Sequence, residues 1–348
     1  VEGSLAAGVR IERFELKRTG WAVTADSVAV DLREWSLRQR SLDVERVAAK
    51  RLQIDWVTSG APSTPPASLG LPFDLGVRRG SIHKLALGAR GAAPTEFQRV
   101  EFSVRMNPQG IEVSDLAGEF ERTRIQAQGR IGASEPFATE ARVQLSSSLQ
   151  GRSVVATALA TGSLQQLRLQ VSADDSAARA RVDAVLLAFG DVPFERLVVD
   201  IESFDPALWM NGVPSMQLRA RADLAPTTLA DGSWSVGGPF SAENSSAGPI
   251  DRDRLPVRSL RGTLAWAAQT LRLDVERAEG VRGSANGALI WSKAGGVQAA
   301  ARFSGVDAST LHSQMVATNA SGQIDYSLID GEQRFVGSAR NTGALPLS

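Results

Sequence analysis

The 348-residue chain has no cysteine, two histidines, four lysines and one tyrosine. The lack of cysteine excludes disulfides, thiolate metal sites and cysteine nucleophiles. His83 and His312 cannot supply a three-histidine metal site or the HExxH helix of a metalloprotease. We therefore expect no metal and no cofactor.

The chain also lacks net charge and long apolar runs. It balances 38 basic against 38 acidic residues, whereas nucleic-acid binders carry a net basic surface. No stretch approaches the ~20 apolar residues of a membrane helix; the longest candidate, 182–189, is interrupted by Asp183. The sequence shows neither a signal peptide nor an initiator methionine, so we expect an excised segment of a longer protein.

Alternation of apolar and polar residues is what the sequence has in abundance. It recurs at 28–32, 52–56, 100–106, 111–113, 142–145, 216–221 and 271–276. Successive side chains of a strand point to opposite faces, so each segment has one aliphatic and one charged face. Helical spacing is nearly absent. The pattern predicts an all-β protein built from antiparallel sheet.

Glycine and proline divide this pattern into segments. We expect β segments at 1–57, 73–236 and 257–348, separated by a Pro-rich loop at 58–72 and a Gly/Pro-rich loop at 237–256. Short helical turns are predicted at 205–209 and 307–311, where an aspartate stands at the N-cap.

A degenerate internal repeat is a further possibility. Residues 100–131 and 260–289 share a strand, a break, a second strand, a glycine and a third strand. Gly118 and Gly129 of the first copy correspond to Gly280 and Gly287 of the second. Simple meanders also look alike, so both interpretations stay open.

The chain is too long for one flat sheet. At ~10 residues a strand it would form about 25 strands, and open sheets rarely exceed ~10 without curling or splitting. Two arrangements follow: sandwiches stacked in series, or a U-shaped sheet lined by its aliphatic face. A membrane barrel is disfavoured because its aromatic girdles are missing.

The search for catalytic chemistry finds no motif for an enzyme. GxSxG, P-loop, GxGxxG and calcium-loop patterns are all lacking. We expect His83 on a strand surface and His312 in a solvent-facing or loosely packed position. The acids at 174–175 and 251–253 are expected in solvated loops. A carbohydrate binder or hydrolase would need aromatic platforms beside paired carboxylates, and the sequence shows none.

The order and spacing of strands and turns in the first 140 residues resemble those of a known family. It is carried by the segments 8–16, 23–32, 42–47, 52–54, 62–72 and 82–88, together with the later unit 100–131 and the turn at 204–208. These resemble the periplasmic region of the TamB family, within the AsmA-like group of bridge-like lipid-transfer proteins. The shared features are patterns of strand and turn rather than invariant functional residues.

The resemblance implies an elongated β-taco, a curled antiparallel sheet with an aliphatic interior and few short helical turns. It implies a periplasmic protein, anchored in the inner membrane by a segment outside this chain, that conducts phospholipids between the inner and outer membranes. It also implies a TamA-like outer-membrane barrel as partner, contacted outside this fragment. The alternative role in this family is to scaffold the assembly of outer-membrane β-barrels such as autotransporters, through exposed strand edges.

Under the lipid hypothesis, acyl chains lie on the aliphatic face. The expected lining residues are Val28, Val30, Leu32, Leu42, Val44, Ile54, Val100, Phe102, Val104, Ile111, Val113, Val143, Leu145, Leu197, Val199, Ile201, Leu218, Leu271, Leu273 and Val275.

Overall fold

The computed structural model describes residues 2–4, 8–18, 20–36, 38–57, 65–89, 92–149, 152–175, 178–208, 212–292, 295–329 and 331–343. Strands hold 73% of these residues and helices 3%, and the sheet is curled and unclosed. The predicted all-β fold with few short helical turns is therefore confirmed. The chain forms two compact units, residues 1–171 with 185–193 and residues 172–184 with 194–348.

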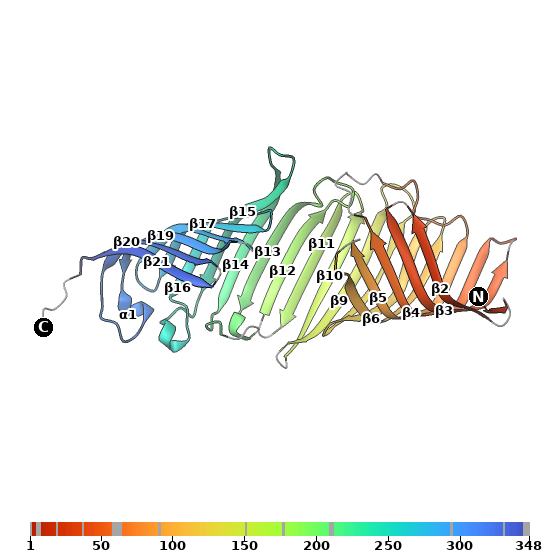
Figure 1. The fold of residues 1–348 in the computed structure, drawn as a ribbon, viewed down its shortest axis with the longest axis horizontal. Helices are drawn as coiled ribbons and strands as arrows, with labels where there is room; N and C mark the ends of the chain where they lie inside the picture. Colours follow the sequence, from red (N-terminus) through yellow and green to blue (C-terminus); the bar gives the residue numbers. More distant parts are fainter. Residues whose placement is uncertain are drawn as a thin grey trace. The chain divides into compact units, whose positions relative to one another are not determined.

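Unit 1 is a ladder of strands that pair in chain order (Figure 1). They are β1 (Glu2–Ser4), β2 (Gly8–Arg18), β3 (Trp21–Ser36), β4 (Ser41–Trp56), β5 (Asp74–Ala89), β6 (Thr95–Asn107), β7 (Gly110–Phe120), β8 (Thr123–Gly132), β9 (Ala138–Leu149) and β10 (Arg152–Ser163). The next strands, β11 (Leu167–Asp175) and β12 (Ala178–Leu186), contribute residues to both units.

One pair of unit 1 differs from the predicted antiparallel pattern. β4 and β5 are parallel, with Leu42 beside Leu75 and Ile54 beside Leu87. The connection between them, 57–73, contains the predicted Pro-rich loop; its residues 58–64 lie outside the described ones. Parallel neighbours need a connection of about a dozen residues or more, which a hairpin turn cannot supply. The Pro-rich loop is long enough to do so, and it makes the sheet mixed.

Unit 2 is a second ladder of antiparallel strands in chain order. They are β13 (Phe194–Phe204), β14 (Leu218–Thr228), β15 (Trp234–Asn244), β16 (Val257–Ala267), β17 (Thr270–Gly280), β18 (Ser284–Ser292), β19 (Gly296–Val306), β20 (Ala320–Ile329) and β21 (Glu332–Asn341). The 3-10 turns η1 (Pro206–Leu208) and η2 (Ile250–Arg252) and the helical turn α1 (Ala308–Leu311) lie in loops. Both predicted helical turns are confirmed.

Two local predictions are wrong. Residues 237–244 were expected in a loop but belong to β15, where Gly238 allows a close approach: a Cβ there would lie 1.9 Å from the carbonyl oxygen of Asp223. Asp174 was expected in a loop but lies in β11, where its carboxylate accepts a hydrogen bond from the Arg179 guanidinium at 3.1 Å. Both predictions were based on local composition, namely glycines and a pair of aspartates. Pairing with strands distant in sequence places these residues in the sheet instead.

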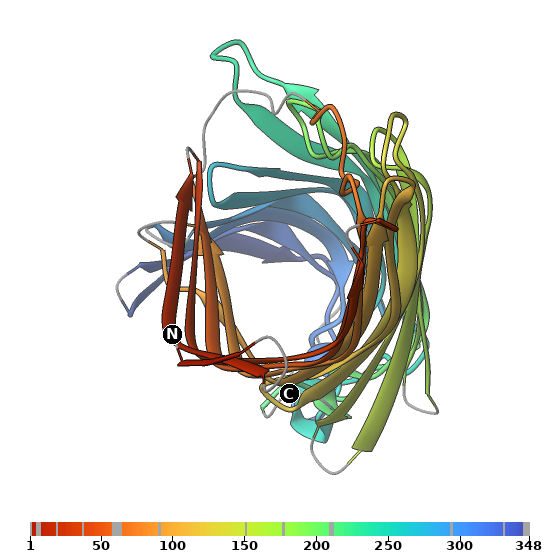
Figure 2. The same cartoon turned by 90° about the vertical axis from the view of Figure 1, so that its right-hand side faces the viewer.

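Bulges in the middle of strands explain why the sheets curl. The register shifts between Val113 and Leu116 on β7, and between Val275 and Ala278 on β17. A bulge bends its strand and increases the local twist. The strands of unit 1 accordingly bend along their length, so that the sheet curves round (Figure 2). In each unit the curl is the arrangement observed, rather than stacked sandwiches.

The two bulges also support the proposed internal repeat. The segments 100–131 and 260–289 fall on the meanders β6–β8 and β16–β18. Val113 pairs with Gly129, and Val275 pairs with Gly287, each directly before its bulge. Both glycines lie where the next strand approaches closely, with 2.7 Å and 2.1 Å between an added Cβ and a carbonyl oxygen. The same device therefore bends the sheet in both segments.

Gly287→Ala should destabilise unit 2, because its Cβ would lie 2.1 Å from the carbonyl oxygen of Ala300. Overpacking of this kind costs about 2 kcal/mol, which lowers the melting temperature of a unit this size by about 6 °C. Thermal unfolding followed by circular dichroism measures the change. Gly76→Ala is the matched control, because an added Cβ there meets only the flexible side chain of Asp43 at 3.3 Å. An equal loss in both variants would contradict the role assigned to Gly287.

Candidate functional site: an apolar face in each unit

Cross-strand pairing in unit 1 gathers apolar side chains into rows across the sheet. One row consists of Leu32, Val44, Val77, Val104, Val113, Gly129, Ala141 and Ala160. The next row consists of Val30, Val47, Gly80, Phe102, Leu116, Ala127, Val143 and Ala158. We call the surface formed by these rows the unit 1 apolar face. No charged residue interrupts either row.

The apolar face of unit 1 is sheltered although no second sheet covers it. On β8, Ile125 and Ile131 are half-buried, whereas Arg124 and Arg130 of the other face are exposed. Val100 is 5% exposed, although its strand belongs to a single-layer ladder. A flat sheet would expose both faces equally, so the difference comes from curling about the apolar side. The apolar face is therefore the concave one.

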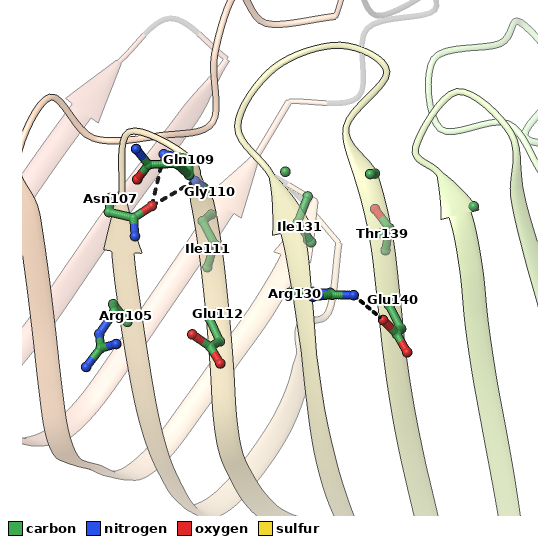
Figure 3. A pocket seen from close by; sticks show the side chains of 13 residues that line it. Arg105, Asn107, Gln109, Gly110, Ile111, Glu112, Arg130, Ile131, Thr139 and Glu140 are labelled. Atoms are coloured by element: carbon green, nitrogen blue, oxygen red, sulfur yellow. Dashed lines mark hydrogen bonds and ion pairs between the residues drawn. The ribbon is translucent and has the colours of Figure 1, made fainter.

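The opposite face of unit 1 carries charges that alternate in sign across strands. Arg105, Glu112, Arg130 and Glu140 are successive cross-strand neighbours, and Arg130 donates a hydrogen bond to Glu140 at 2.8 Å. Figure 3 shows this row beside a depression of about 440 Å³ at the strand ends. Opposite charges across a strand pair stabilise a sheet and keep its outer face hydrated.

Unit 2 repeats the arrangement with its own apolar face. One row consists of Val199, Ala222, Phe240, Gly262, Val275, Gly287, Ala301, Ile324 and Gly337. A neighbouring row consists of Leu264, Leu273, Leu289, Ala299, Tyr326 and Phe335. Glycine and alanine are frequent here, so the surface has shallow places between larger side chains.

The exposed area of the protein shows that these faces are not closed on themselves. The chain exposes 22405 Å². A compact protein of this mass would expose about 14,000 Å², and two separate compact domains of half the mass about 16,000 Å². Soluble monomers rarely leave apolar patches above a few hundred Å² open without using them for binding. The excess area fits apolar faces that no second layer of the described residues covers.

All twenty expected lining residues lie in strands, and none is fully exposed. Val44 and Val100 are buried, and the remainder are half-buried. Thirteen of them, at positions 28–145, belong to unit 1, and seven, at positions 197–275, belong to unit 2. The rows described above contain Leu32, Val44, Val104 and Val113 side by side. Their contact with lipid stays a prediction.

The structure gathers aromatic side chains that the sequence leaves scattered. Trp266 and Trp291 stack with ring centroids 6.0 Å apart, reaching over Leu271 of the strand between them. Trp234 contacts Phe194 edge-on at 6.0 Å. All four aromatic residues lie near the strand ends on the same side of the unit 2 sheet. We call these four residues the aromatic rim. Their positions next to turns are the only sequence signal that could have suggested it.

The histidines and clustered acids form no catalytic arrangement in the described part of the chain. His83 is exposed on β5. His312 Nδ1 lies 4.0 Å from a carboxylate oxygen of Asp251. Hydrogen bonds from the hydroxyl and the amide of Ser313 lower the pKa of Asp251 below its usual value. This contact, not anticipated from the sequence, ties η2 to the segment that follows α1.

Comparisons with known proteins gave no match to a family model, a curated protein or a solved structure. Among the described residues, no group of three or more acidic or histidine side chains is placed to hold a metal ion. None of the helices in the described ranges is long and apolar enough to cross a membrane. The function is therefore argued from the two apolar faces.

Proposed function

We propose that the protein binds phospholipids by their acyl chains on its apolar faces and passes them through the periplasm, between the inner and the outer membrane. The observation that carries this proposal is the apolar face of each unit, which in unit 1 lies on the concave side of the curled sheet. The rows in unit 1 offer aliphatic contacts over eight neighbouring strand positions without a charged side chain. A surface of this kind suits long hydrocarbon chains better than compact polar ligands.

The hydrophobic effect supplies both binding and mobility. Each buried CH₂ group contributes about 0.8 kcal/mol, so two acyl chains are held strongly. Because the rows contain interchangeable aliphatic side chains, a chain that slides by one position exchanges one apolar neighbour for another. The barrier to sliding is therefore low, which transport requires. The two rows of unit 1 offer head groups no polar partner, so we expect only acyl chains to lie on them.

The resemblance to the TamB family adds the cellular setting to this proposal. It supports a periplasmic location, an inner-membrane anchor outside this chain and a TamA-like outer-membrane barrel as partner. None of the described helices is long enough to serve as that anchor.

Scaffolding of barrel assembly is the second candidate, and one strand favours it. All ten residues of β21 are exposed, and within the described residues β21 pairs only with β20. Its charged residues are Glu332, Arg334 and Arg340, and it contains neither lysine nor proline, the residues that protect edge strands most often. An extended client strand could add to this edge by β-augmentation.

Transfer of a fluorescent phospholipid between two vesicle populations tests the lipid proposal. We expect the protein to accelerate transfer in proportion to its concentration, because each apolar face shields acyl chains from water. Serum albumin stripped of lipid serves as a control that binds acyl chains. A β-rich protein without an apolar face serves as the control that does not. Transfer no faster than with the β-rich control would contradict the proposal and favour the scaffold.

A further inference from the structure

The aromatic rim lies where the apolar face of unit 2 ends. Trp266 and Trp291 belong to the row Val236, Trp266, Leu271, Trp291, Val297 and Leu328, the last row before the turns. The row directly inside it contains Leu264, Leu273 and Leu289. Trp234, Trp266 and Trp291 are 38%, 40% and 38% exposed. Each indole therefore has one side on the apolar face and one side in water.

The polar atoms of these tryptophans are unused. Within the described residues, none of the three indole N–H groups donates a hydrogen bond to a protein group, and the exposure of these side chains leaves the donors accessible to water or to a ligand. An indole that is half apolar and half wet, with a free donor, matches the interface between hydrocarbon and lipid head groups, where tryptophan is enriched in membrane proteins. The free donors suit phosphate or ester oxygens.

At the opposite strand ends of unit 2, two buried polar side chains are held by hydrogen bonds to neighbouring loops. Asn244 is 6% exposed, and its amide oxygen accepts hydrogen bonds from the backbone of Gln217 and Ser246. Asp307 is 4% exposed and accepts from Ser309 and Thr318. These side chains fix the loops that carry η2 and α1.

The width of the apolar face fits an acyl chain that starts at the rim. From Trp266 to Leu260, six residues along β16, the distance is about 20 Å. One leaflet of a bilayer has a hydrocarbon depth of about 15 Å, half of the total core. Along this path the side chains of the concave face are Leu264, Gly262 and Leu260, all apolar. An acyl chain that lies along β16 from Trp266 therefore ends before it reaches the polar loops at the other end of the strand.

We propose that the aromatic rim of unit 2 is the head-group subsite for a bound glycerophospholipid. The glycerol and phosphate region lies against Trp234, Trp266 and Trp291, and the acyl chains extend inward across the strands. This inference rests on the proposed function and adds to it a fixed orientation of the lipid. The chemistry recognised is an acyl lipid with hydrogen-bond acceptors at its interfacial end.

Depth-dependent quenching of tryptophan emission tests the orientation. A variant with Trp21, Trp35, Trp56 and Trp209 replaced by phenylalanine retains only the three rim tryptophans as emitters. It is loaded with phosphatidylcholine that carries a nitroxide either on the choline or at carbon 12 of one chain, and bound lipid is quantified by mass spectrometry. At equal loading we expect the head-group label to quench about two-fold more, because the rim lies at the interface.

A binding measurement separates the rim from the apolar face itself. Trp266→Phe/Trp291→Phe keeps the aromatic packing but removes two donors, and should weaken phosphatidylcholine binding about five-fold for each hydrogen bond lost. Binding of diphenylhexatriene, which has no head group, should be unchanged. Trp35→Phe, in unit 1, is the matched control for loss of an indole.

The outcomes distinguish failure of the inference from failure of the proposed function. Bound lipid that is quenched equally or more by the label at carbon 12 overturns the head-group subsite and leaves lipid binding intact. Equal weakening of diphenylhexatriene binding by the double variant also overturns it. No bound phospholipid in any variant overturns both. Rim emission that changes with protein concentration but not with lipid would instead assign the rim to contact between copies of the chain.

Discussion

Val104→Glu combined with Val275→Glu should remove phospholipid binding while the protein stays folded. Val104 lies in the apolar row of unit 1 between Val77 and Val113, and Val275 lies between Gly262 and Gly287 in unit 2. An ionised carboxylate among acyl chains loses its hydration without gaining a partner, which costs several kcal/mol. We expect affinity for a fluorescent phospholipid to fall at least about 50-fold, equivalent to roughly 2.3 kcal/mol.

Gln128→Glu combined with Gln298→Glu is the matched control for this variant. It adds the same two charges, one to each unit, on exposed positions of the polar face. Gln128 is paired with Arg142, so the new charge there has a cationic neighbour. Binding should stay within about two-fold of the wild type, since surface charges contribute little. Similar losses in both variants would show that net charge, and not the apolar face, governs binding.

Phe137→Ala should cause the largest loss of stability among single substitutions in unit 1. Phe137 has no exposed surface and contacts Phe189 with ring centroids 5.9 Å apart. Its backbone also holds the turn between β8 and β9, because its carbonyl oxygen accepts hydrogen bonds from Thr139 and Leu164. Truncation of a buried phenylalanine costs about 3–5 kcal/mol, which lowers the melting temperature by about 10 °C in a unit of this size.

Phe335→Ala provides the comparison for Phe137→Ala, because Phe335 is 63% exposed on β21. The same truncation there should cost less than about 1 kcal/mol. Differential scanning calorimetry of both variants measures the contrast. If Phe137→Ala lost no more stability than Phe335→Ala, the turn between β8 and β9 would not be the packed end of unit 1 that the structure indicates.

Period-two alternation was sufficient to predict the all-β fold, although not every strand. It works because the residues of a strand alternate between faces whatever the strand pairs with. Pairing direction is different: the parallel contact between β4 and β5 depends on where the chain goes through the loop at 57–73, which no local pattern specifies. The glycines at 237–238 show the same limit. They resemble loop residues, but close strand approach requires them.

The sequence predicts an aliphatic face on the strands. It does not predict how the strands curl or which side chains of different strands meet. The aliphatic positions follow from alternation, and the curl follows from bulges such as that between Val275 and Ala278. A bulge changes register between strands, so a single strand's sequence does not reveal it. The stacking of Trp266 on Trp291 likewise depends on two registers across β17. The aromatic rim therefore becomes visible only in the folded sheet.

Lipid content of the purified protein is the most direct test of the central claim, that the apolar faces hold acyl chains. The protein is purified without detergent, extracted with organic solvent and analysed by mass spectrometry. We predict phospholipid in amounts comparable with the protein, and its near-complete loss in the Val104→Glu/Val275→Glu variant. A folded, monomeric protein free of lipid would contradict the claim and assign these faces to contact with protein.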